Sequence, residues 1–123
     1  MRLIPYSSRA YPDKLTHIAQ PPYAIFCKGA MPDARKSVGI VGARMCSEYG
    51  RSIATKLGKL LADKDVQVIS GMALGIDSAS HAGALQGKGS TFAVLGCGCD
   101  VCYPKNARKL PHPHGPGQLR DTL

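Results

Sequence analysis

Short apolar runs alternate along the chain with longer segments in which apolar residues recur at helical spacing. Four runs are rich in β-branched and aromatic residues and are followed closely by glycine, which is typical of strands: residues 23–27, 37–41, 66–70 and 91–95. Helical spacing predicts helices over residues 47–64 and 75–86. This alternation with short connections predicts an α/β fold: a parallel sheet with helices on both faces, incomplete at the C-terminus.

The first helix is expected to begin after Ser47 as its N-cap, with Glu48 well placed for the helix dipole. Its apolar residues recur every four positions and predict a stripe buried on the sheet, which Ala54 and Leu60 widen: Tyr49, Ile53, Leu57 and Leu61. Three basic residues lie off that stripe and are expected to face solvent: Arg51, Lys56 and Lys59. The second helix is expected to bury mostly small residues: Ile76, Ala79, Gly83 and Leu85.

Proline-rich stretches divide the chain into three parts. Residues 1–22 are polar, end in two prolines and are predicted to be a lead-in segment. Residues 23–110 carry the α/β pattern and are predicted to form one domain. Residues 111–123 begin with a run of Pro, His and Gly that favours neither helix nor central strand, so we expect a disordered tail. His112 and His114 have no further ligands there, so no metal site is predicted.

Composition and charge narrow the function. The 123 residues suffice for one domain with a buried core. A net charge of +8 and a pI of about 9.5 favour an acidic partner such as nucleic acid. Five cysteines without a secretory signal favour a reducing cytoplasm over a disulfide scaffold. No apolar run approaches the roughly twenty residues that span a bilayer, so we expect a cytoplasmic protein with no membrane partner.

Two glycine turns follow predicted strands, in Val38-Gly-Ile-Val-Gly-Ala-Arg44 and in Val68-Ile-Ser-Gly-Met-Ala-Leu-Gly-Ile-Asp77. The carboxyl edge of a parallel sheet presents backbone N–H groups that suit an anion. Arg44 stands between a strand end and a helix start, where its planar fork suits a phosphate. Ser47, Ser70 and Gly71 are expected to lie beside that anion. The sequence therefore predicts a phosphate site at this edge, most simply for the backbone of a nucleic acid.

Common nucleotide motifs are absent. Gly39 and Gly42 are spaced wrongly for a dinucleotide fingerprint, and no acidic residue closes that unit. Residues 83–90 imitate a Walker A loop, but Gly89 replaces the hydroxyl residue that should follow Lys88, the glycines are one residue too close, and the segment ends a helix instead of opening one. We therefore expect no cofactor.

Two further clusters have simpler interpretations. The thiols of Cys97, Cys99 and Cys102 are interpreted as small side chains in a tight turn, because structural zinc sites more often pair two C-x₂-C knuckles. Asp77 and His81 lie one helical turn apart and can share a hydrogen bond, which would orient the imidazole. Without a nucleophile beside them, a structural or ligand-orienting role is favoured over catalysis.

The same stretches resemble the successive signatures of the DNA-processing protein A family (DprA, also called Smf). The resemblance lies in residues 38–50, 70–77, 81–85 and 91–100 and in Tyr103-Pro104, and it runs from about Tyr11 to Leu110 in the family's order and spacing. Members of the family continue with further strands and helices that residues 111–123 do not resemble. A truncated member is therefore expected.

The resemblance implies a Rossmann-like domain that binds single-stranded DNA and helps to load the recombinase RecA during natural transformation, without enzymatic activity. It carries Arg44, Ser47, Ser70 and Gly71 over as DNA-binding candidates, and Gly42 and Lys88 complete the predicted phosphate-binding set. In the family, the missing part contributes to RecA contact and to a homodimer. The competing class is an enzyme, a phosphoribohydrolase of the lysine-decarboxylase-like type. Its P-G-G-x-G-T-x-x-E stretch, which supplies the catalytic glutamate, is absent here.

Overall fold

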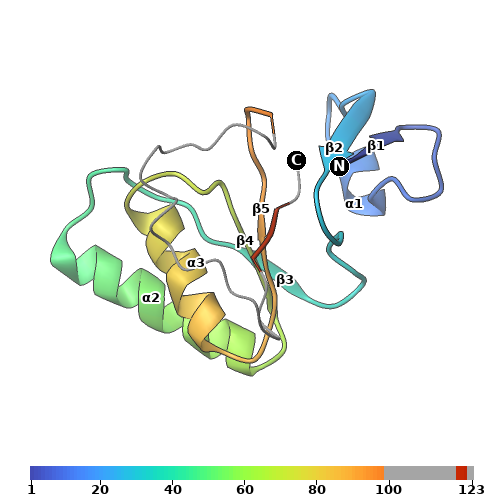
Figure 1. The fold of residues 1–123 in the computed structure, drawn as a ribbon. Helices are drawn as coiled ribbons and strands as arrows, with labels where there is room; N and C mark the ends of the chain where they lie inside the picture. Colours follow the sequence, from blue (N-terminus) through green and yellow to red (C-terminus); the bar gives the residue numbers. More distant parts are fainter. Residues whose placement is uncertain (99–118, 122–123) are drawn as a thin grey trace.

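The computed structural model describes residues 1–98 and 119–121, and Figure 1 shows their arrangement. The N-terminal part contains β1 (Arg2–Pro5), α1 (Asp13–Thr16) and β2 (Ala24–Cys27), with β1 and β2 paired antiparallel. A small core forms beneath this hairpin from Ile4, Tyr11, Ile25 and Cys27. The strand expected at residues 23–27 is thus present, but it belongs to this separate sheet and not to the parallel one. The backbone groups of β2 form their hydrogen bonds with β1 and not with a strand of the parallel sheet.

The parallel sheet has the order β3-β4-β5-β6, and all three strand pairs are parallel. Its strands are β3 (Ser37–Gly39), β4 (Gln67–Ser70), β5 (Thr91–Ala93) and β6 (Leu119–Asp121). The predicted α/β class with a parallel sheet is therefore confirmed. The strand expected over residues 37–41 is shorter than predicted, and it is not buried on both faces: Val38 is exposed because β3 has no further strand beside it among the described residues.

The strand β6 corrects the expectation of a disordered tail for residues 119–121. Pairing in a sheet uses backbone N–H and C=O groups, so a polar segment can add to an edge that already exists. β5 provides that edge, and Thr91 aligns with Leu119. The rest of the predicted tail, residues 111–118 and 122–123, lies outside the described residues, as do His112 and His114.

The two long helices are α2 (Glu48–Asp63) and α3 (Ile76–Gln86), close to the predicted bounds. Figure 1 shows them side by side on the same face of the sheet, whereas the sequence predicted helices on both faces. The chain order explains the difference. Because β3, β4 and β5 follow one another across the sheet in a single direction, right-handed crossovers place both helices on one face.

The contact between α2 and α3 is made by small residues. A Cβ atom added to Gly83 would lie 1.9 Å from the carbonyl oxygen of Thr55, and one added to Gly58 would lie 2.3 Å from that of Ser80. The buried positions of α2 are accordingly Ala54, Gly58 and Ala62. The helices approach so closely that only residues with little or no side chain fit between them.

This close contact overturns the predicted buried stripe on α2. Tyr49 is 77% exposed, Ile53 and Leu57 are also exposed, and Leu61 is half-buried. Ala54, which was part of the predicted stripe, is buried as expected, whereas Leu60 is exposed. The helix turns its small residues, not its large ones, toward α3. In α3, Ala79 and Gly83 are buried as expected, while Ile76 and Leu85 are only half-buried. The main core gathers where both helices meet β4: Ile40, Ala62, Val68 and Ala84.

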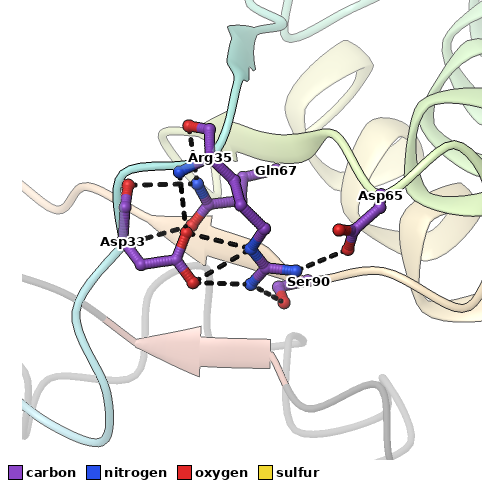
Figure 2. A network of polar contacts seen from close by, with 5 residues as sticks. All are labelled: Asp33, Arg35, Asp65, Gln67 and Ser90. Carbon is purple, nitrogen blue, oxygen red and sulfur yellow. Dashed lines mark hydrogen bonds and ion pairs between the residues drawn. The ribbon is translucent and has the colours of Figure 1, made fainter.

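At the amino edge of the sheet, a polar network joins the linker before β3 to β4 and β5 (Figure 2). The fully buried side chain of Gln67 accepts a hydrogen bond from the backbone N–H of Asp33 and donates to the carbonyl oxygens of Asp33 and Arg35. The Arg35 guanidinium pairs with Asp33 and Asp65 and donates to Ser90. The pKa of Asp33 is lowered mainly by its hydrogen bonds from Arg35. The network fixes this linker at the end of the sheet opposite the glycine turns.

Candidate nucleic-acid interface

The carboxylate of Asp77 joins the two glycine turns at the carboxyl edge of the sheet. It accepts the N–H of Gly42 at 3.3 Å through one oxygen and the N–H of Gly71 at 3.1 Å through the other. Asp77 is buried in the first turn of α3, where the helix dipole favours a negative charge. The acceptor for these two N–H groups is therefore a side chain of the protein, and the phosphate expected at this edge stays a prediction.

The two turns also interlock through their backbones. Gly75 has a φ of +83°, and a Cβ atom there would lie 2.2 Å from the carbonyl oxygen of Ala43. The N–H of Ile76 donates to that same oxygen at 3.2 Å. A Cβ atom at Gly42 would lie 2.7 Å from the side chain of Ile76. Because both positions admit only glycine, the turn that carries Arg44, residues 42–47, is held firmly against the start of α3.

Arg44 lies on the outside of this interlocked edge. It is exposed, and it forms no ion pair or side-chain hydrogen bond with any residue that the structure describes. Three residues further on, Ser47 caps α2 as predicted, accepting the N–H of Gly50 at 3.1 Å. Its exposed hydroxyl keeps a proton to donate. A planar guanidinium and a hydroxyl donor therefore stand three residues apart on one exposed turn, and both groups suit the oxygens of a phosphate.

The other predicted site residues have different surroundings. Ser70 is buried and donates its hydroxyl proton to the carbonyl oxygen of Ile40 at 2.6 Å, so its donor is used within the fold. The N–H of Gly71 is used by Asp77. Lys88 is exposed, but it lies between α3 and β5, at the amino edge of the sheet. Gly42, Arg44 and Ser47 therefore share one turn after β3, and Ser70 and Gly71 lie at the same edge, at the end of the neighbouring strand β4. Lys88 lies at the opposite edge of the sheet.

The hydrogen bond that the spacing of Asp77 and His81 allows is not formed, because each side chain has another partner. The Nδ1 atom of His81 lies 2.7 Å from the hydroxyl of Thr91, whose single proton goes to the carbonyl oxygen of Val68. His81 therefore donates through Nδ1–H, and its Nε2 atom is a buried acceptor without a partner among the described residues. Burial lowers the pKa of His81 to about 4, and the charge of Asp77 opposes that shift only in part. His81 is a neutral residue of the core.

Residues 1–98 contain no cluster of side chains that could form a metal site. No group of three or more histidine, cysteine or acidic side chains lies close enough together there to hold an ion. Cys97 is exposed with a free thiol, and Cys99 and Cys102 lie outside the described residues. Among the helices that the structure describes, none is long and apolar enough to cross a membrane.

Sequence reasoning missed two features of this edge. It treated Asp77 as a partner of His81, although an acidic residue in the first turn of a helix that follows a glycine turn is a natural acceptor for the N–H groups nearby. It also placed Tyr49 in the core. The exposure of Tyr49 follows from the small residues on the opposite side of α2, which the sequence shows at positions 54, 58 and 62.

The parallel sheet and the interlocked glycine turns define an α/β protein of the Rossmann-like class, with an exposed arginine at its carboxyl edge. A sequence profile described as DNA recombination-mediator protein A matches residues 2–113, so the chain belongs to that family. The resemblance inferred from the sequence is thereby confirmed.

Individual relatives agree. The chain is 38% identical over 109 residues to the DNA processing protein DprA of Bacillus subtilis and 41% identical over 102 residues to that of Streptococcus pneumoniae, covering 87% and 81% of this chain. The solved structure of the Streptococcus pneumoniae protein matches 98% of this chain with a TM-score of 0.81 and 32% identity. DNA processing protein A from Helicobacter pylori, described as having a unique single-stranded DNA binding mode, matches 80% with a TM-score of 0.70 and 28% identity.

The matched regions are only part of each relative. This chain spans 37% and 36% of the two curated proteins from Bacillus subtilis and Streptococcus pneumoniae, and 42% and 46% of the two solved chains. The shared region contains the glycine turns and the Arg44 turn.

Proposed function

We propose that this chain binds single-stranded DNA, and that the turn at residues 42–47 holds a phosphate of the strand. The observation that carries the proposal is Arg44, exposed and without an ion pair among the described residues, on a turn that Gly75 and Asp77 hold in place. Because the backbone of this turn is already fixed, binding has to order only the Arg44 side chain and not the segment that carries it. The single-stranded DNA binding described for the Helicobacter pylori relative supports the choice of ligand.

Within this site, the roles differ from those first expected. Arg44 supplies the charge and the two-point geometry, and Ser47 supplies a hydroxyl donor beside it. Gly42, Ser70 and Gly71 shape the edge from within, because their polar groups are already paired or buried. Lys88, at the other end of the sheet, would contact DNA only as a separate site.

The proposal extends to the family's cellular role. We infer that the bound strand is handed to the recombinase RecA during natural transformation, and that the chain acts by binding and not by catalysis. A homodimer and the RecA contact belong to the same proposal. Both rest on the family relationship, since the chain spans less than half of the relatives it matches.

Binding is tested by fluorescence anisotropy with a labelled oligodeoxythymidine at low and at physiological salt. We expect saturable binding that weakens by roughly an order of magnitude or more across this range, as a handful of phosphate contacts requires. Affinity that does not change with salt would indicate an uncharged pocket instead. To test the competing enzyme class, the chain is incubated with nucleoside monophosphates. Release of free base would replace the binding role with a hydrolase.

A further inference from the structure

The outward side of α2 carries large apolar residues that the fold does not use. Tyr49, Ile53, Leu57 and Leu60 are 77%, 44%, 40% and 53% exposed and recur at helical spacing; we call them, together with Lys56 among them, the α2 outer face. The opposite side of the helix packs on α3 through small residues. Four large apolar side chains in one stripe exceed the scattered exposure that an ordinary surface shows. A partner is expected to cover them.

The charges on α2 restrict what that partner is. Arg51 lies 3.8 Å from Glu48, and Lys59 lies 2.7 Å from Asp63, so both are partly neutralised within the helix. Lys56 has no such ion pair among the described residues and lies in the middle of the α2 outer face. An antiparallel pairing of α2 with a second copy would bring the two Lys56 side chains together near its midpoint, and like charges there oppose association. The face suits a partner that offers both apolar surface and negative charge.

Single-stranded DNA has this combination, because its unpaired bases expose flat apolar faces beside charged phosphates. The α2 outer face begins at Tyr49, in the first turn of the helix, five residues after Arg44. Met45, between them, is 96% exposed. Aromatic side chains beside basic ones are the recurring surface for single strands. The arrangement therefore continues the phosphate site into a surface for bases.

We propose that the α2 outer face contacts the bases of the strand whose phosphate Arg44 holds, with Tyr49 stacking on a base and Lys56 near a neighbouring phosphate. This inference rests on the proposed function and adds a second contact, between the protein and the flat faces of the bases. In a duplex these faces are stacked on one another and are not accessible. Tyr49 thus distinguishes single strands from duplex, while Arg44 responds to any phosphate.

The test compares an oligodeoxythymidine with an abasic strand of the same length, both labelled, by anisotropy at one salt concentration. Wild-type protein is expected to bind the thymidine strand several-fold to a hundredfold more tightly, the range that stacking on one aromatic residue gives. Tyr49→Ala should lose this preference and bind both strands as the wild type binds the abasic one. Tyr49→Phe should keep it. Tyr23→Ala, which removes a tyrosine that is 93% exposed in the N-terminal part, is the matched control and should behave as wild type.

Salt dependence separates the two roles. Tyr49→Ala should leave the slope of log affinity against log salt unchanged, whereas Arg44→Ala should reduce it by about 0.7, the value for one phosphate contact on a single strand. If wild type binds neither strand, the proposed function itself fails. If wild type binds the thymidine strand and Tyr49→Ala matches Tyr23→Ala, the DNA site stands and the base-contact proposal is overturned. Loss of self-association on sedimentation of Tyr49→Ala, with DNA binding unchanged, would overturn it in favour of a protein partner.

Discussion

The side chain of Asp77 accepts a hydrogen bond from the backbone N–H of Gly42, 35 residues earlier in the chain. Its second oxygen accepts from Gly71, so one buried carboxylate holds both glycine turns at a fixed spacing. This arrangement gives the edge a resident anion. In the proposed function, phosphate recognition then falls to the exposed side chains of Arg44 and Ser47 on the 42–47 turn.

Replacing Asp77 tests this bridge. Asp77→Ala leaves two partly buried N–H groups without an acceptor, and each such loss costs about 1–3 kcal/mol. We expect the free energy of unfolding, measured by urea denaturation, to fall by roughly 2 kcal/mol or more. The free energy of unfolding of Asp77→Asn should lie between those of wild type and Asp77→Ala, because its amide keeps one acceptor and turns a donor toward the other N–H. Glu48→Ala removes an exposed acid from the first turn of α2 and should cost much less. Equal losses in Asp77→Ala and Glu48→Ala would mean that the bridge adds no stability.

The close approach of α2 and α3 gives a second prediction. In Gly83→Ala the new methyl group would lie 1.9 Å from a backbone oxygen, a distance at which the helices must move apart. Alanine improves helix propensity by about 1 kcal/mol, but overpacking of a rigid contact costs about 1–3 kcal/mol or more, so we expect net destabilisation. Gly39→Ala is the control, since its nearest neighbouring atom would be 4.0 Å away. A thermal melt in which Gly83→Ala equals or exceeds wild type would show that the two helices are not packed this closely.

His81 gives a prediction about pH. Its pKa is about 4 in the folded protein and about 6.5 when unfolded, so the unfolded chain binds more protons between these values. Stability should therefore fall as the pH is lowered from about 7 to 4, by on the order of 3 kcal/mol. In His81→Gln this part of the loss should disappear, while His17→Gln, at an exposed site, should keep it. The measurement is the urea midpoint of wild type and of both variants at several pH values between about 4 and 7. A slope that survives in His81→Gln would assign it to other groups.

The amino-edge network allows buried and exposed polar contacts to be compared. Gln67→Leu leaves one N–H and two carbonyl groups without their partner, and we expect a loss of about 2 kcal/mol or more. Arg35→Ala removes ion pairs that are largely exposed, and such pairs contribute little in water. Urea denaturation should therefore rank Gln67→Leu as the less stable variant. The reverse order would show that the ion pairs, and not the buried amide, hold the linker.

Local pattern predicted much of this fold. Both helices, the central strands and the Ser47 cap follow from periodicity and turn residues, because these signals depend on neighbours in the chain. The local pattern did not determine how the helices pack against each other. Whether α2 buries Tyr49 or Ala54 depends on how closely α3 approaches, and that is set by Gly83, almost thirty residues away.

The candidate site shows the same division. The sequence located Arg44 correctly on an exposed turn at the sheet edge, since its position follows from the strand and the helix that flank it. It could not show that Asp77 takes the N–H groups of Gly42 and Gly71, because that pairing depends on how the two turns fold against each other. Lys88 was included in the predicted phosphate-binding set, and the chain direction places it at the other edge of the sheet.

The central claim is that Arg44 holds a phosphate of single-stranded DNA, and anisotropy with one labelled oligodeoxythymidine at one salt concentration tests it most directly. Loss of a charged hydrogen-bonding contact costs about 1.5–3 kcal/mol, so Arg44→Ala should weaken binding by roughly tenfold to a hundredfold. Arg44→Lys should weaken it less without restoring it, since lysine keeps the charge and loses the planar fork. Arg51→Ala, on the side of α2 away from the outer face, should bind as wild type. Equal affinities for wild type and Arg44→Ala would contradict the account.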